Sequence, residues 1–461
     1  MPAKRIFSAA MALLLASSFA LPSGAQAAFD PAFNFIDSDA GFDFTVSSGS
    51  ATVVGCTTTC PVNLVIPNTL GGNNVTAIDD GAFANQDLAS VSIPYAVTSI
   101  GMAAFYNNKL GSVKLPYLLQ TIGRDAFAYN SISSVVIPYG VTSIGAGAFL
   151  GNALASVKFP GNNLVSIGDY AFDHNALMSV VIPNSVRTIG NYAFADNALT
   201  YLNLGVGVES IGNGAFVANY LTSLVIPNSV TSVGAGAFSY NKLTSLTLST
   251  SMTTISFESF TVNSLTSVLL PPSVNTIEAS AFEDNGLAAL VIPGTVTAIG
   301  DRAFASNSLT SVVFLSNAPT AGIEAFVANT GLAAVTRTND ATGWSGTWSG
   351  VPVTIADTRA AATVKPSVAG TAKVGKVVTA AGTWTGYPTP TFTYQWYACT
   401  KAVSVASSTV PATCKKITGA TKRTFKLTSA QRGKYVAVLV KGTSLRTAAT
   451  TWLSTTTAKV K

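Results

Sequence analysis

The chain has 461 residues, of which 48% are hydrophobic and 10% are charged, and its formal net charge is +6. A chain of this length can bury a large core and can form two or three domains. Beyond the first 25 residues, no uncharged apolar stretch reaches the about 20 residues of a membrane-spanning helix, so we expect no such helix in that part of the chain.

The N-terminus has the three parts of an export signal. Lys4 and Arg5 form a positive region, residues 6–21 are apolar, and residues 25–27 form a small-residue cleavage site ending at Ala27. We predict a signal peptide over residues 1–27, no transmembrane segment after its cleavage, and a secreted, extracellular or cell-surface protein. An uncleaved anchor helix is the alternative, which the short apolar segment disfavours.

Four cysteines form two local pairs. Cys56 and Cys60 enclose three residues, and Cys399 and Cys414 enclose fourteen. Local pairs in an exported chain predict two disulfides. A zinc site made by all four cysteines is the alternative, but neither pair has the two-residue spacing of a zinc knuckle.

A phenylalanine recurs every 22 residues, with a single step of 23. The series is Phe83, Phe105, Phe127, Phe149, Phe172, Phe194, Phe216, Phe238, Phe260, Phe282, Phe304 and Phe326. An asparagine follows it by three residues in all repeats except one, where Gln86 stands, and an isoleucine or valine usually precedes it by five. A period of this kind predicts a solenoid of about 12 coils, in which each coil buries its open faces against its neighbours.

Each repeat contains two predicted strands and one turn. The alternating Leu-x-x-Val-x-Ile stretch predicts a short strand that the following proline ends, and Val-Thr-Ser-Ile-Gly predicts a second strand. Ala-Phe with the polar residues after it predicts a tight helical turn. We expect the recurrent asparagine to hydrogen-bond backbone groups where the coil bends, which makes a ladder along the solenoid; a row of ligand-binding asparagines is the alternative.

Units such as residues 221–238 resemble the BspA-type leucine-rich repeats of bacterial and protist surface proteins. The resemblance covers about residues 62–332 and implies an extracellular adhesion or binding protein without catalysis. We expect residues 28–61, with the first cysteine pair, to form an N-terminal cap. Residues 333–358, with Trp344 and Trp348, are expected to close the other end.

The composition changes after the repeats. We expect a linker over residues 359–363 and a separate domain over residues 364–461, because this part is rich in Val, Thr and aromatic residues. The alternating strand at Phe392–Tyr397, and residues 427–438 with Tyr435, resemble bacterial immunoglobulin-like modules. The resemblance implies a small β-sandwich, in which the second cysteine pair is expected to staple a hairpin loop.

Charge is distributed unevenly between the two parts. Residues 360–461 contain fifteen Lys or Arg and no Asp or Glu, whereas residues 28–359 contain nine basic and twenty acidic residues. This basic domain predicts retention on an anionic cell-wall polymer, lipid headgroup or acidic polysaccharide. Solubility alone is the alternative, and the absence of a recognition motif argues against nucleic acid.

Residues that could carry chemistry are few. His174 is the single histidine, at a turn position where we expect a solvated side chain without a partner in the neighbouring coils. A Ser-His-Asp site would have to include it. The spacing of Asp37 and Asp39 suits calcium, but the following residues do not continue an EF-hand loop. We predict no enzyme activity, no metal site and no cofactor.

One row of side chains is a candidate binding surface. Residues seven and nine positions after the phenylalanine should point away from the core, because side chains alternate along a strand. We predict an exposed apolar strip that contacts a partner or a second copy, formed by Tyr201, Val225, Leu269, Val291 and Val313. The alternative is that β-branched residues are there only because they favour strands.

These patterns predict a secreted or cell-surface binding or adhesion protein, whose repeat surface contacts an unknown extracellular protein or glycan. A structural envelope protein that self-associates is the alternative. A degradative enzyme would need paired carboxylates in a cleft, for which the sequence offers no support.

Overall fold

The computed structural model describes residues 37–338, 341–355, 361–385, 390–443 and 450–461. The predicted signal peptide therefore lies outside the described residues. Strands make up nearly all of the regular structure, and the described residues contain one 3-10 helix, η1 (Ser429–Gln431), and no α-helix. Among them, no helix is long and apolar enough to cross a membrane.

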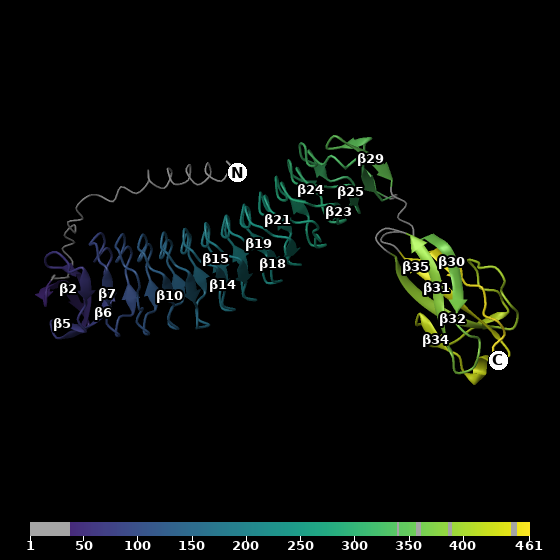
Figure 1. Ribbon diagram of the computed structural model, residues 1–461, viewed down its shortest axis with the longest axis horizontal. Coiled ribbons are helices and arrows are strands. Elements are labelled where there is room, and N and C mark those ends of the chain that lie inside the picture. Colours follow the sequence, from purple (N-terminus) through teal and green to yellow (C-terminus); the bar gives the residue numbers. More distant parts are fainter. Residues whose placement is uncertain (1–36, 339–340, 356–360, 386–389, 444–449) are drawn as a thin grey trace.

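One stack of short parallel strands, the first strand stack, runs along the coils (Figure 1). Each of its strands except the last ends with a buried Ile or Val. In register, Ile144 lies beside Ile122 and Ile167. Its strands are β6 (Asn73–Ile78), β8 (Ser99–Ile100), β9 (Thr121–Ile122), β11 (Ser143–Ile144), β13 (Ser166–Ile167), β15 (Thr188–Ile189), β17 (Ser210–Ile211), β19 (Ser232–Val233), β21 (Thr254–Ile255), β22 (Thr276–Ile277), β24 (Ala298–Ile299) and β26 (Thr320–Ala321).

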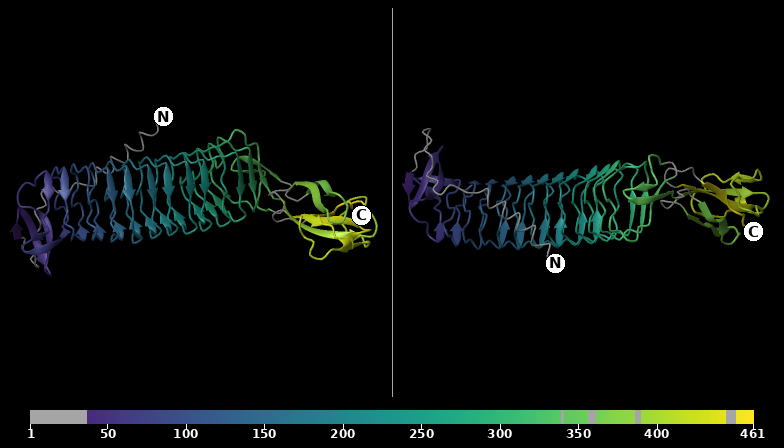
Figure 2. Two further views of the ribbon diagram at one scale, coloured as in Figure 1. Left: turned by 60° about the horizontal axis from the view of Figure 1, so that its bottom comes forward. Right: turned by 90° about the horizontal axis from the view of Figure 1, so that it is seen from above.

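A second strand stack runs on the other side of the coils (Figure 2). The middle residue of most of its strands points into the core, and the two flanking residues point outward. Its strands are β4 (Asn63–Val65), β7 (Ser90–Ser92), β10 (Ser134–Val136), β12 (Ser156–Lys158), β14 (Ser179–Val181), β16 (Tyr201–Asn203), β18 (Ser223–Val225), β20 (Ser245–Thr247), β23 (Ala289–Ile292), β25 (Ser311–Phe314), β27 (Val335–Arg337) and β29 (Val351–Ile355).

The recurrent phenylalanines form one continuous column inside the coils. All twelve are buried, and successive ring centroids lie between 5.2 and 5.9 Å apart with nearly parallel planes. Phe194 and Phe216, for example, are 5.4 Å apart with an angle of 2° between their planes. The predicted β-solenoid with a phenylalanine core is therefore confirmed.

The segment around each phenylalanine is a turn and not the expected helical turn. In the coil of Phe127, Asp125 and Tyr129 have φ values of 53° and 56°, and the other coils have left-handed residues at the same two positions. Left-handed residues interrupt a right-handed helix. The N–H of Phe127 bonds instead to the carbonyl of Ala148 in the next coil, at 2.8 Å.

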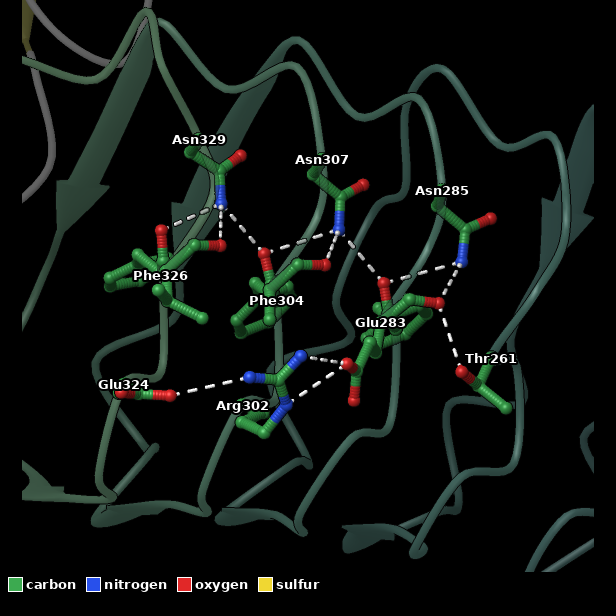
Figure 3. A network of polar contacts seen from close by, with 12 residues as sticks. Thr261, Glu283, Asn285, Arg302, Phe304, Asn307, Glu324, Phe326 and Asn329 are labelled. Carbon is green, nitrogen blue, oxygen red and sulfur yellow. Dashed lines mark hydrogen bonds and ion pairs between the residues drawn. The ribbon is translucent and has the colours of Figure 1, made fainter.

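The asparagine ladder is present, and Figure 3 shows three of its members. Asn307 donates from Nδ2 to the carbonyl oxygen of Phe282 at 2.9 Å, and its Oδ1 accepts the N–H of Leu287 at 2.9 Å. Its neighbours Asn285 and Asn329 make the same bonds one coil earlier and one coil later. Each asparagine thus pairs backbone groups that the bend would otherwise leave unsatisfied inside the protein.

Antiparallel strands close both ends of the solenoid. At the N-terminal end, β1 (Asp37–Asp39), β2 (Phe42–Ser47) and β3 (Ser50–Cys56) continue the first strand stack, and β5 (Thr69–Leu70) pairs with β6. Phe42 covers the end of the phenylalanine column, 6.3 Å from Phe83. At the other end, β28 (Thr347–Trp348) pairs with β29, and Trp348 packs 5.6 Å from Phe326.

Residues 361–461 form two antiparallel sheets that share one core. The first contains β30 (Ala361–Ala369), β31 (Val377–Thr385) and β34 (Thr424–Lys426), and the second contains β33 (Cys414–Lys416), β32 (Thr391–Cys399), β35 (Tyr435–Thr443) and β36 (Thr450–Leu453). Trp396 is fully buried between them and donates from Nε1 to the carbonyl of Lys422 at 2.8 Å. Because Ala361 and Ala362 pair with Thr385 and Trp384, the first strand begins inside the range expected to be linker.

Both cysteine pairs are disulfides. Cys56 is bonded to Cys60 at the end of β3, and Cys399 to Cys414. The second bond joins directly paired residues of β32 and β33, and so it links two strands of the same sheet.

Candidate binding surfaces

The outer face of the second strand stack exposes most of the predicted strip. Tyr201, Val225 and Leu269 are 54%, 65% and 83% exposed. Leu269 holds the equivalent position in a coil without a regular strand there. These three side chains are accessible to a partner.

Val313 is buried, at 6% exposure, which corrects its assignment to the exposed strip. The register sets it between Val291 in β23 and Thr336 in β27. These β-branched side chains flank it on the same face of a five-stranded sheet, and Val291 is itself half-buried. The accessible part of the strip therefore ends at Leu269.

Polar residues also interrupt the strip. Asn203 and Thr247 are exposed at the strand position that Val181, Val225 and Leu269 hold in their own coils.

 The exposed row from Val181 to Leu269 thus alternates, coil by coil, between apolar and polar side chains. Contacts with a partner on this face would be spaced apolar points and not one apolar patch.

Three consecutive coils carry an exposed tyrosine that the sequence reasoning missed. Tyr95, Tyr117 and Tyr139 are 60%, 69% and 64% exposed. Each follows the proline that ends the second-stack segment of its coil, at the apex of a tight turn; Val141, for example, donates its N–H to the carbonyl of Pro138 at 3.1 Å. The signal was a Pro-Tyr pair twelve residues after the phenylalanine in three successive repeats. We call Tyr95, Tyr117 and Tyr139 the tyrosine row.

The tyrosine row is accessible because nothing on its own coils covers it. In the residues that the structure describes, none of its three rings makes a hydrogen bond or a ring contact. The next coil has Gly161 at the equivalent place, where a Cβ atom would lie 3.1 Å from the Tyr139 ring. Asn163 of that coil donates to the Tyr139 carbonyl at 2.9 Å and holds the edge of the row.

His174 has partners, contrary to the sequence-based expectation. It lies in the left-handed turn position, with φ 51°, and its side chain is 53% exposed. Its Nδ1 lies 2.9 Å from Oδ1 of Asp173, and its Nε2 lies 3.9 Å from Oδ2 of Asp196 in the next coil. Asp173 is the neighbouring residue in the sequence, but Asp196 is twenty-two residues away. The sequence did not reveal this arrangement because only the stacking of coils brings Asp196 to the ring.

Burial and the hydrogen bond between Asp173 and His174 change the pKa values of both side chains. Burial raises the pKa of the Asp173 carboxyl, and the hydrogen bond from His174 offsets part of the rise. The same hydrogen bond raises the pKa of His174, whereas burial of the ring opposes the increase. The pKa values of both side chains are therefore raised, and each group holds its proton more tightly than it would in water.

The C-terminal sheets present only positive charge. Fourteen of the fifteen Lys and Arg residues in 360–461 lie in described segments, and all fourteen are exposed. Because this region has no acidic residue, these cations are not neutralised within it. Lys365 lies over the Trp452 ring, 4.6 Å from its centroid.

Comparisons with known proteins bear on the repeats. The family described as BspA type leucine rich repeat region matches residues 76–200 and 233–342, in six copies. No curated protein sequence matches the chain.

Three solved structures are similar to the chain. A leucine-rich repeat protein from Bacteroides ovatus is 22% identical with a TM-score of 0.46, and the match covers 70% of this chain and 100% of that one. The pneumococcal vaccine antigen PcpA is 18% identical with a TM-score of 0.42, covering 66% and 87%. A leucine rich cell surface protein from Faecalibacterium prausnitzii is 25% identical with a TM-score of 0.37, covering 66% and 94%. Since the family match spans more than half of the residues, the chain belongs to the BspA-type leucine-rich repeat family.

Proposed function

We propose that this is a secreted or cell-surface binding protein whose solenoid contacts an extracellular glycan and whose basic C-terminal region holds it on an anionic envelope polymer. The tyrosine row is the observation that carries the binding role. Exposed tyrosines are enriched where proteins bind partners, because the ring offers a large contact area with little loss of conformational entropy.

The spacing of the tyrosine row favours a glycan over a protein. Successive tyrosines of the row lie in successive coils. The phenylalanine ring centroids of these coils are 5.4 and 5.2 Å apart, which gives the spacing between the coils. A chain of pyranose rings can place successive C–H faces on such a ladder of aromatic faces. A protein interface would instead be expected to have an apolar centre. The strand face of the same three coils does not provide one, because it exposes Ser92 and Lys114 beside Val136.

Replacing the tyrosine row tests this role. Asparagine is the chosen replacement, because Asn184 and Asn228 occupy the equivalent turn position in other coils and preserve the fold. We expect the triple variant Tyr95→Asn, Tyr117→Asn and Tyr139→Asn to lose at least about tenfold in affinity for polysaccharides that the mature protein retains in affinity electrophoresis. Tyr201→Thr, on the strand face, is the matched control. Equal affinity of the triple variant and the unmodified protein would refute the role of the row.

The basic C-terminal region supports retention on the envelope. Residues 360–461 contain no Asp or Glu beside these exposed cations. The cations would therefore attract teichoic acid, acidic polysaccharide or anionic headgroups, and salt would weaken this attraction by screening the charges. Cell fractionation with a salt wash tests this. Release by salt is expected, and a protein found only in the medium at low salt would contradict retention.

The shape of this region supports an immunoglobulin-like module. Two antiparallel sheets enclose Trp396, which lies in a central strand, as in sandwich folds of this type. We propose residues 361–461 as its extent, because Ala361 and Ala362 already pair with β31, and the linker is then shorter than the expected residues 359–363. Expression of this segment alone, with a cooperative thermal transition, would support its independence.

Self-association is a second candidate function, favoured by the exposure of Val225 and Leu269. Replacing Val225, Leu269 and Val291 together with threonine should leave the fold intact and weaken any dimer in analytical ultracentrifugation. A monomer at all concentrations before substitution would remove this candidate.

A further inference from the structure

The turns that follow Phe172 and Phe194 bring three metal-ligating side chains together. His174 and Asp196 occupy the same position in successive coils, and both have left-handed backbones, with φ values of 51° and 47°. The N–H of His174 bonds to the carbonyl of Ala195 at 3.2 Å, so the two turns are held beside each other. Side chains at this position therefore leave neighbouring coils in the same direction.

Asp173 is unusual for its place in the repeat. The residue after the phenylalanine is uncharged in the other coils except at Glu283, which Arg302 neutralises. The other residues at this place are Ala84, Tyr106, Ala128, Leu150, Ala195, Val217, Ser239, Thr261, Ala305 and Val327. The side chain of Asp173 is only 3% exposed. A carboxylate so buried is costly unless a cation lies against it.

No Lys or Arg supplies that cation within the described residues, where the one ion pair of Asp173 is with His174. The imidazole of His174 is positive only when it has bound a proton. A metal ion bound by the imidazole would neutralise the carboxylate without requiring that proton. The chemistry of the group is therefore suited to a cation that the protein itself does not provide.

The distances suit one ion. Ligand atoms of Asp173, His174 and Asp196 all lie within 4.8 Å of one another, and Nδ1 of His174 is 2.9 Å from Oδ1 of Asp173. Two ligands that are each about 2.1 Å from one tetrahedral zinc ion are themselves about 3.4 Å apart, which is close to this distance. The side chains of His174 and Asp196 are 53% and 41% exposed, so small rotations can complete the site.

We propose that Asp173, His174 and Asp196 form a binding site for a divalent transition-metal ion such as Zn²⁺. One imidazole with two carboxylates is a donor set for zinc and its neighbours in the first row, whereas calcium and magnesium require more oxygen ligands. Because the ligands come from two coils, the ion also joins them and stabilises the middle of the solenoid. The exposed side of the site leaves a position for water.

The test uses the mature full-length protein, freed of metal with EDTA and titrated with ZnCl₂ by calorimetry and in thermal melts. We expect one zinc ion per chain at this site and a melting temperature that rises with zinc, and no comparable rise with MgCl₂ or CaCl₂. Cobalt(II) bound in place of zinc should give a visible absorption spectrum typical of nitrogen and oxygen ligands.

His174→Asn and Asp196→Asn should each weaken zinc binding by at least about tenfold. Asparagine at position 174 is compatible with the fold, because Asn85 and Asn107 hold the same left-handed position in other coils. Asp284→Asn, at the position of Asp196 four coils further on, is the matched control and should bind zinc as the unmodified protein does. Melting of the metal-free variants checks that each is folded. Absence of zinc binding, or equal binding by folded His174→Asn, overturns the proposal.

Discussion

The side-chain amide of Asn219 donates a 2.9 Å hydrogen bond to the backbone carbonyl of Phe194, one coil earlier. Its Oδ1 accepts the N–H of Leu199 at 3.0 Å, and the residue is 1% exposed. Alanine at this position would leave a buried donor and a buried acceptor without partners. We expect Asn219→Ala to lower the free energy of unfolding by about 3 kcal/mol, measured by urea denaturation. Asn203→Ala, which removes an exposed asparagine, should be nearly neutral.

Phe216 lies in the middle of the aromatic column, 5.4 Å from Phe194 and 5.3 Å from Phe238, and is fully buried. Phe216→Ala removes a ring that both neighbours contact and leaves a cavity that the rigid coils cannot close. We expect a loss of about 3 to 5 kcal/mol in thermal or chemical unfolding. A neutral result would show that the coils repack around the gap.

Arg302 joins three coils through carboxylates, as Figure 3 shows. It is paired with Glu283 one coil earlier and lies 3.3 Å from Glu324 one coil later. Burial opposes ionisation of Glu283, but hydrogen bonds from Arg302 and Ser280 outweigh it and lower the pKa of Glu283 below its usual value of 4.5. A carboxyl group with a lowered pKa in the folded state stabilises the protein above its ordinary pKa, and this stabilisation is lost as the pH falls through the lower value.

We therefore expect Arg302→Gln to lower the stability by about 1 kcal/mol or less at pH 7, since the arginine is partly exposed to solvent. The difference from the unmodified protein should shrink as the pH falls below about 4.5, because Glu283 is protonated first in the variant and only at lower pH in the unmodified protein. Unfolding curves at a series of pH values measure this. A difference that does not change with pH would show that Arg302 acts through packing and not through charge.

The disulfide between Cys399 and Cys414 closes a loop whose ends are paired strands. Replacing both cysteines with serine should destabilise the C-terminal region by about 3 kcal/mol, because the unfolded chain regains the entropy of an open loop. The melting of the solenoid should be unaffected. Non-reducing peptide mapping of the unmodified protein should find the two local pairs, and a cross-pair such as Cys56 with Cys399 would contradict this arrangement.

The period of the repeat was enough to predict the core. The role of Phe216 and that of Asn219 follow from their recurrence, because a side chain that every coil keeps must satisfy a need that every coil has. The same reasoning failed for the expected helical turn around the phenylalanine. Sequence periodicity locates a turn but does not determine the sign of φ, and Asp125 and Tyr129 adopt left-handed conformations that residues other than glycine take infrequently.

Single deviations from the repeat were decided by the tertiary structure. Alternation placed Val313 on the outer face, but its exposure depends on Val291 and Thr336 in the strands beside it. Asp173 and Asp196 are far from each other in sequence, and stacking brings both to the ring of His174. A repeated sequence by itself determines what all coils share, whereas the environment of a residue that occurs in one coil depends on the neighbouring coils that happen to lie against it.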